Sequence, residues 1–126
     1  MTKQVFDYIR NTFQVEPEFL WAGSPDAAAF RNKRNKKWFA AFLGKTSKRK
    51  LGIDSDETVD IINLKCDPLM SFSVVDRKRI FPGYHMNKEH WISILLDGSV
   101  PMEELQFLIG NSYELIDMKA RKTKNT

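Results

Sequence analysis

One short run, Trp38 to Leu43 (WFAAFL), is apolar at every position. Side chains of a β-strand alternate between the two faces of a sheet, so this run is apolar on both faces. A strand of this kind has to be covered on both sides, as strands in the middle of a sheet are. The sequence therefore predicts a central strand that the rest of this 126-residue chain must bury.

Other segments also carry strand patterns. Residues 58–65 alternate, with Val59 and Ile61 on one side and Ile62 and Leu64 on the other, which is typical of a strand. The expected strands are residues 27–32, 37–43, 58–65 and 90–96, with a further short strand beginning near Leu51. Residues 15–21, 32–36 and 76–83 are expected to form an extended connection, a charged hairpin tip and a basic loop.

Three segments have the periodicity of helices. Asp67 and Pro68 predict a helix start, because Asp is a favoured N-cap and Pro fits the first helical position. We expect Leu69 and Phe72 of this helix to face the core. The expected helices are residues 2–13, residues 68–75 and a last helix that begins after Pro101 and ends near residue 118.

The predicted elements follow the order α-β-β-β-α-β-α, without a repeat or a linker. Hairpin-like strands with helices on one side favour the α+β class, as an antiparallel sheet with helices packed on one face. The length fits a single domain, which we place at residues 1–118, followed by a basic, flexible tail at 119–126. No segment has the roughly 18 apolar residues of a membrane span, and the N-terminus lacks a signal-like run. We expect a cytoplasmic, monomeric protein.

Cys66 is the single cysteine of the chain, which excludes an intrachain disulfide. Next to a predicted helix start its pKa can fall, and His85 or His90 would serve as a base if the fold brings them close. Buried apolar filler is the other fate open to a lone cysteine. Two histidines and one cysteine do not make a recognised zinc-finger spacing, and no glycine-rich phosphate loop is present. We therefore expect no metal, no cofactor and no enzymatic activity.

Positive charge is concentrated in residues 31–50, which hold nine Lys or Arg and no acid, although the net charge is only +4. Such a segment can neutralise phosphates, so it predicts weak, largely sequence-independent DNA binding through backbone contacts. The pattern is also typical of a solvated hairpin whose charges keep sheet edges unpaired. The expected phosphate contacts are Arg31, Lys33, Arg34, Lys36, Lys37, Lys48, Arg49 and Lys50.

The densest polar cluster is the run 84–91 (YHMNKEHW). Its imidazoles can titrate near neutral pH, and its lysine can hold an anion. In a structural role, the aromatic side chains would anchor the loop while the polar ones satisfy its irregular backbone. The alternative to DNA is therefore a small anionic ligand or a protein partner, bound by Tyr84, His85, Asn87, Lys88, His90 and Trp91. An adaptor would instead expose apolar side chains, for which Phe19, Leu20 and Trp21 are the candidates.

The run PGYHMNKEHWI at 82–92 resembles the signature of the YjbR/MmcQ family. Further stretches match that family in the same order, so the resemblance covers nearly the whole chain. They are VEPE at 15–18, KWFA at 37–40, LKCDP at 64–68, LDGSVP at 96–101, EEL at 103–105 and SYEL at 112–115.

The resemblance implies a CyaY-like, frataxin-like architecture, in which helices pack against an antiparallel sheet. It also implies the DNA-binding role that has been suggested for the family, an expectation that rests on shape alone. It does not carry over iron binding. Frataxins bind iron through carboxylates clustered on the first helix, whereas the first predicted helix here has one acid, Asp7, beside Lys3 and Arg10.

Overall fold

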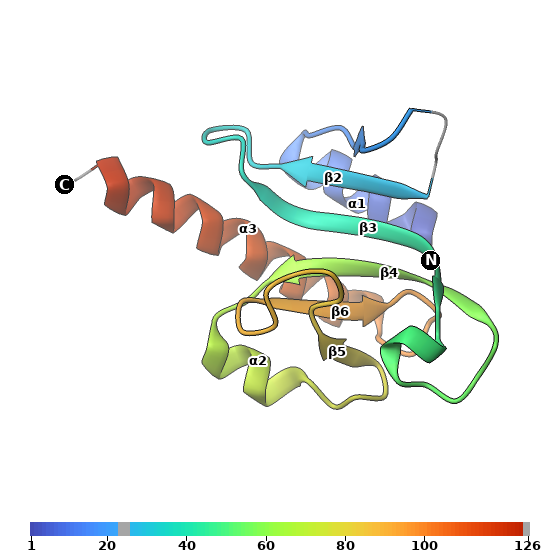
Figure 1. The fold of residues 1–126 in the computed structure, drawn as a ribbon. Coiled ribbons are helices and arrows are strands. Elements are labelled where there is room, and N and C mark those ends of the chain that lie inside the picture. The colour runs from blue at the N-terminus through green and yellow to red at the C-terminus, as the bar shows by residue number, and fades with distance from the viewer. Residues whose placement is uncertain (23–25, 125–126) are drawn as a thin grey trace.

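A six-stranded antiparallel sheet, in the order β1-β2-β3-β4-β6-β5, organises the chain (Figure 1). The computed structural model describes the backbone of residues 1–22 and 26–124 and the side chains of 1–22 and 26–118. This architecture confirms the predicted α+β class. The elements are α1 (Thr2–Phe13), β1 (Glu18–Phe19), β2 (Ala27–Arg31), β3 (Trp38–Ser47), the 3-10 helix η1 (Arg49–Leu51), β4 (Thr58–Lys65), α2 (Pro68–Val74), β5 (Ile80–Pro82), β6 (Trp91–Leu95) and α3 (Met102–Lys124).

The larger core lies between the sheet and the helices, which cover one of its faces (Figure 1). Val5 and Ile9 of α1 are fully buried there, as are Leu105 and Ile109 of α3. Helical spacing of these side chains gives each helix an apolar stripe that only the sheet can bury. The prediction of helices packed on one face is confirmed.

The opposite face of the sheet carries a second, smaller apolar cluster. Val59, Ile61, Phe81 and Leu95 are buried in it. It is covered by η1, the segment after η1 and the loop between β5 and β6, which lies in front of the sheet in Figure 1. Both faces of β3 are therefore buried, which explains why the run from Trp38 to Leu43 is apolar throughout.

The inward face predicted for α2 is wrong. Leu69 is 83% exposed and Phe72 is 90% exposed, whereas Met70, Ser71 and Val74 turn toward the sheet. The side chain of Asp67 accepts a hydrogen bond from the backbone N–H of Met70 and fixes where the helix starts. The start is as predicted, but Met70 with Val74 is also an apolar pair at helical spacing, and it is this pair that packs against the core.

Three local assignments also differ from the sequence-based expectation. The segment near Leu51 is the 3-10 helix η1 rather than a strand. Two short strands were not predicted: β1 pairs with β2, and β5 pairs with β6. Both lie at an edge of the sheet, where a few residues suffice because only one side is paired.

The last helix runs past the expected domain boundary at residue 118. The backbone of α3 continues to Lys124. Side chains from residue 119 on, which include the charges of the predicted basic tail, lie outside the described residues. Within the described part of the chain, no helix is long and apolar enough to cross a membrane.

Candidate anion-binding site

The basic segment 31–50 does not form one continuous face. Its first part makes the β2–β3 turn, and its last part makes η1, at the other end of β3 (Figure 1). A strand of ten residues, rising about 3.3 Å per residue, spans roughly 30 Å. One short segment of nucleic-acid backbone would therefore not reach both parts.

Four of the eight residues that were expected to contact phosphate instead form ion pairs with carboxylates. Most of these pairs are largely exposed and contribute little to stability, whereas the Asp117 side chain that pairs with Arg34 is only 8% exposed. A phosphate would nevertheless have to compete with each carboxylate for its cation. The pairs join Arg31 to Glu18, Arg34 to Asp117, Lys48 to Glu57 and Arg49 to both Asp54 and Asp56, at nitrogen–oxygen distances of 2.6 to 3.4 Å.

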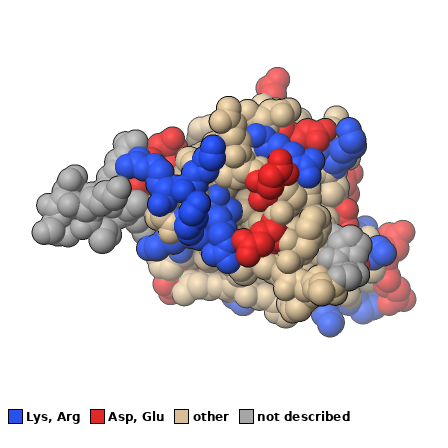
Figure 2. All heavy atoms as spheres, turned by 90° about the horizontal axis from the view of Figure 1, so that it is seen from above, with Lys and Arg blue, Asp and Glu red and all other residues tan. Residues whose placement is uncertain are grey.

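The remaining hairpin lysines are Lys33, Lys36 and Lys37. Among the described residues, none of the three has a carboxylate within ion-pair distance. The turn itself is fixed, because the amide of Asn35 donates to the Ile116 carbonyl at 3.2 Å and so ties the turn to α3. Figure 2 shows Lys and Arg side chains gathered at the end of the molecule where this turn lies.

A buried polar network holds the start of the 84–91 loop on the second face of the sheet. Asn63 of β4 and Ser93 of β6 are both fully buried. The amide of Asn63 donates to the Tyr84 carbonyl at 2.9 Å, and the Tyr84 N–H donates to Ser93 Oγ at 2.8 Å. Ser93 Oγ in turn donates to Asn63 Oδ1. Every member is paired, so the network fixes the position of Tyr84.

The structure divides the candidate residues of the 84–91 loop among different places. Asn87 is structural, because its side chain accepts from the Glu89 N–H at 2.8 Å. Trp91 is buried in β6, where the Lys65 ammonium lies 5.3 Å from its ring centre. His90 borders a small apolar hollow beside Cys66, while His85 borders another hollow. The two imidazoles therefore do not act on one ligand.

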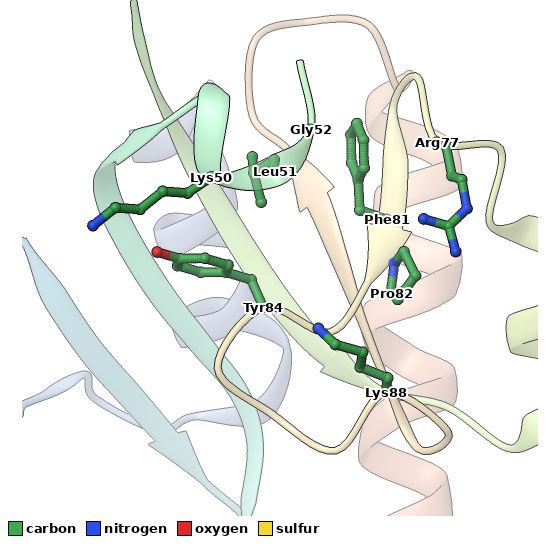
Figure 3. Close-up of a pocket in the computed structure, with 8 residues that line it drawn as sticks. All are labelled: Lys50, Leu51, Gly52, Arg77, Phe81, Pro82, Tyr84 and Lys88. Carbon is green, nitrogen blue, oxygen red and sulfur yellow. The ribbon is translucent and has the colours of Figure 1, made fainter. Parts of the chain in front are cut away.

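Tyr84 and Lys88 do meet at a hollow on the second face of the sheet, with a volume of about 400 Å³. Figure 3 shows its residues coming from η1, from the turn before β5, from β5 and from the 84–91 loop. We call it the cationic hollow. Its lining residues are Lys50, Leu51, Gly52, Arg77, Phe81, Pro82, Tyr84 and Lys88.

Charge in the cationic hollow is of one sign. Lys50, Arg77 and Lys88 line it, and none of its eight lining residues is acidic. The Lys88 ammonium donates to the Gly83 carbonyl at 3.3 Å, which holds it near the rim. Phe81 and Tyr84 supply apolar surface between the cations (Figure 3). Three cations spaced around an apolar wall favour an anion that also carries some apolar surface.

Comparisons with known proteins place these features in a family. The YjbR family model matches residues 11–115, which include the whole cationic hollow. The chain belongs to the YjbR family. YyaQ of Bacillus subtilis, an uncharacterised protein, is 37% identical over 113 residues, which cover 90% of this chain and 95% of YyaQ. YbdF of Escherichia coli O157:H7, also uncharacterised, is 42% identical over 59 residues, 46% of this chain and 48% of YbdF.

Solved structures share the YjbR fold described above. A crystal structure of a Pseudomonas syringae protein superposes with a TM-score of 0.82 at 39% identity, covering 91% of this chain and 97% of that one. A Deinococcus radiodurans protein with a DUF419 domain gives a TM-score of 0.71 at 24% identity, over 95% and 80% of the two chains. The latter shows the fold alone. The likeness to CyaY and the frataxins stays a prediction.

Arg77 was missed as a site residue by the sequence analysis, which placed it in a basic loop. The Asp76 carboxylate organises this turn by accepting backbone N–H bonds from Lys78, Arg79 and Ile80 at 2.8 to 3.0 Å. Arg77 itself has a φ of 57°, in the left-handed region that side chains rarely adopt. The signal available in the sequence was Asp76 before a basic run, a common start of a tight turn.

Asp76 makes the free energy of unfolding of this YjbR-family protein depend on pH in the acid range. Burial alone would raise the pKa of its carboxyl. The three backbone donors and the Arg79 guanidinium lower the pKa by more than burial raises it, so the pKa lies well below its usual value. The contribution is complete above the unfolded-state pKa of about 3.9 and is lost as pH falls toward the folded-state pKa. We expect Asp76→Asn to be less stable than wild type at pH 6 and to approach it below pH 4. Urea unfolding at several pH values measures this, and a gap independent of pH would contradict it.

Cys66 is 1% exposed, and burial together with the adjacent Asp67 charge raises the pKa of its thiol to about 11. It is therefore held as a neutral thiol near neutral pH, which disfavours the nucleophilic role considered above. At pH 8 its thiolate fraction is roughly 200-fold below that of an ordinary cysteine of pKa about 8.5. We expect a thiol reagent to label the native protein at least about a hundredfold more slowly than the urea-unfolded protein. Equal labelling rates would show an accessible, activated thiol.

Proposed function

We propose that this YjbR-family protein binds a small phosphate- or carboxylate-bearing ligand in the cationic hollow. The observation that carries the proposal is that Lys50, Arg77 and Lys88, from three separate segments, line one hollow that has no acid among its lining residues. A hollow lined by charges of one sign attracts ions of the opposite sign. The hollow of about 400 Å³ lies in the range of about 300 to 1,000 Å³ that is usual for small-molecule sites.

The proposal is of binding rather than of catalysis. The lining offers positive charge and aromatic surface but neither an imidazole nor a carboxylate to serve as a general base. His85 borders the neighbouring hollow, and Cys66 is buried behind the sheet as a neutral thiol. Affinity for a ligand would come from the positive charge and the aromatic surface of the lining residues.

Calorimetric titration with inorganic phosphate, pyrophosphate and citrate tests the proposal. We expect saturable binding that weakens as salt rises, because part of the attraction is screened. The double variant Arg77→Ala, Lys88→Ala removes two lining cations and is expected to weaken binding at least about tenfold. The matched control is Lys33→Ala, Lys37→Ala, which removes the same charge from the β2–β3 turn and is expected to leave binding unchanged.

Two outcomes would contradict the proposal. One is the absence of saturable binding to any of the three anions at low salt. The other is an equal loss of affinity in the hollow variant and in the control, which would show attraction to net charge rather than to a site. Circular dichroism and thermal unfolding of both variants verify that they remain folded.

A second candidate function, weak binding of the DNA backbone, is supported by the basic end of the molecule in Figure 2. Lys33, Lys36 and Lys37 are available there, although Arg31 and Arg34 hold carboxylates. Fluorescence anisotropy of labelled duplex and single-stranded DNA, at low and physiological salt, tests it. Binding that the Lys33→Ala, Lys37→Ala control weakens and the hollow variant does not would support this function. No binding at low salt would exclude it.

A further inference from the structure

A second hollow of about 370 Å³ adjoins the cationic hollow. The two share Lys50 and Tyr84 as lining residues, so they are neighbours, and we call the two hollows together the groove. Trp21, Lys45 and His85 are among the residues that line only the second part. A ligand anchored in the cationic hollow can therefore extend past Tyr84 into this second, aromatic hollow.

Three of the eleven residues that line the aromatic hollow carry aromatic rings, namely Trp21, Tyr84 and His85. The side chain of Trp21 is 61% exposed. The rings of Tyr84 and His85 lie against each other, with centres 4.0 Å apart. Exposed aromatic faces of this kind are able to stack with a planar group of a ligand, which would also cover apolar surface now in contact with water.

The charges of the two hollows decide which part of a ligand each would hold. The cationic hollow has three cations and no carboxylate among its lining residues. The aromatic hollow has Lys45 and the shared Lys50, opposed by the carboxylate of Asp26. An anionic group is therefore favoured in the cationic hollow, and a neutral planar group in the aromatic hollow.

Backbone geometry supports the groove as a formed feature. Lys45 and His85, which line the aromatic hollow, have φ angles of 53° and 61°. Arg77, which lines the cationic hollow, has a φ of 57°. Non-glycine residues adopt such angles uncommonly, and three of the five that do so in the described part of the chain line the groove, while Gln14 and Lys36 lie elsewhere.

We propose that the ligand is an anion joined to a planar ring, with the anion in the cationic hollow and the ring stacked in the aromatic hollow. This rests on the proposed function, because the cationic hollow supplies the anchor. Phosphate esters of an aromatic alcohol and nucleoside monophosphates belong to this class. Free phosphate would occupy only the cationic hollow and would not contact the aromatic hollow.

The test compares inorganic phosphate, methyl phosphate, phenyl phosphate and adenosine monophosphate by calorimetry on the wild-type protein. The first two lack a planar ring, so we expect them to bind with similar affinity. The two compounds with rings are expected to bind about tenfold or more tightly, the size of one stacking contact. Trp21→Ala is expected to remove that gain while leaving the affinity for inorganic phosphate unchanged, since Trp21 is exposed and lies outside the cationic hollow.

The outcomes separate this inference from the proposed function. If all four compounds bind equally, or if Trp21→Ala keeps the gain from the ring, the cationic hollow binds anions and the stacked ring is overturned. If Trp21→Ala weakens phosphate and ring compounds alike, the aromatic hollow has no role of its own and the inference is also overturned. If none of the four binds, the proposed function itself fails, and this inference with it.

Discussion

Replacement of Asn63 by alanine is expected to lower the free energy of unfolding by about 3 kcal/mol and to release the loop that carries Tyr84 and Lys88. Asn63 is fully buried and links β4 to both Ser93 and the Tyr84 carbonyl. Its removal leaves both partners without that hydrogen bond in the interior, at about 1 to 3 kcal/mol for each unsatisfied group. Urea unfolding measures the loss.

A matched control for this change is Asn111→Ala in α3. The Asn111 amide makes only a contact of 3.3 Å to the sulfur of Met70. Alanine is also the better helix former by a few tenths of a kcal/mol, so the change in stability is expected to be within about 0.5 kcal/mol of zero. If Asn63→Ala costs no more than Asn111→Ala, the buried network does not hold the loop. Loss of phosphate binding in Asn63→Ala alone would link the network to the cationic hollow.

Patterns that depend on local sequence predicted the fold well. The run from Trp38 to Leu43 indicated a central strand because both of its faces are apolar, and β3 is buried on both faces. The phase of α2 was not predictable in the same way. Met70 with Val74 and Leu69 with Phe72 are both apolar pairs at helical spacing, and two turns are too short to choose between them.

Short edge strands were missed for a related reason. β5 has three residues and β1 has two, so neither contains enough positions to show alternation. Their pairing is decided by neighbours far away in the chain, as when Phe81 of β5 pairs with Ser93 of β6. The turn before β5, which depends on this pairing, brings Arg77 to the cationic hollow.

Charge counted along the chain does not show which side chains pair in the fold. Residues 31–50 hold no acid and residues 51–76 hold six, so the sequence predicted phosphate contacts within the basic segment. In the fold, β3 and β4 are antiparallel neighbours, so the two segments face each other. Lys48 then meets Glu57, and Arg49 meets Asp54 and Asp56. Two of the basic side chains are thereby paired with acids of the neighbouring segment, whereas Lys33, Lys36 and Lys37 have no carboxylate within ion-pair distance among the described residues.

In the 84–91 loop, the sequence did select some of the residues that line a hollow in the structure. Two of its predicted ligand residues, Tyr84 and Lys88, do line the cationic hollow, and His85 lines its neighbour. Residue type alone was enough to select them. Their partners Lys50 and Arg77 come from segments that only the folded chain brings together. A ligand site assembled from separate loops is therefore visible in sequence only in part.

Replacement of Gly83 by alanine is expected to lower the free energy of unfolding by about 2 kcal/mol, within the 1 to 3 kcal/mol usual for overpacking. A Cβ atom at Gly83 would lie 2.7 Å from Trp91 Cβ and 3.0 Å from the Trp91 carbonyl oxygen. Neither atom can turn away, because both are fixed to the backbone. The strands would have to separate, although the Gly83 N–H donates to that same carbonyl at 2.9 Å.

Gly110→Ala is the matched control, and it is expected to have the opposite sign. Gly110 lies inside α3, and among the described residues no atom beyond its own stretch of helix lies within 4 Å of the position of an added Cβ. Alanine there should stabilise the protein by about 0.5 to 1 kcal/mol, since glycine is the poorer helix former. Thermal unfolding of both variants measures the two changes in stability. A Gly83→Ala variant as stable as wild type would mean that β5 and β6 can part without cost. The Lys88 ammonium, which donates to the Gly83 carbonyl, would then be free to move with them, and the cationic hollow would be less rigid than its geometry implies.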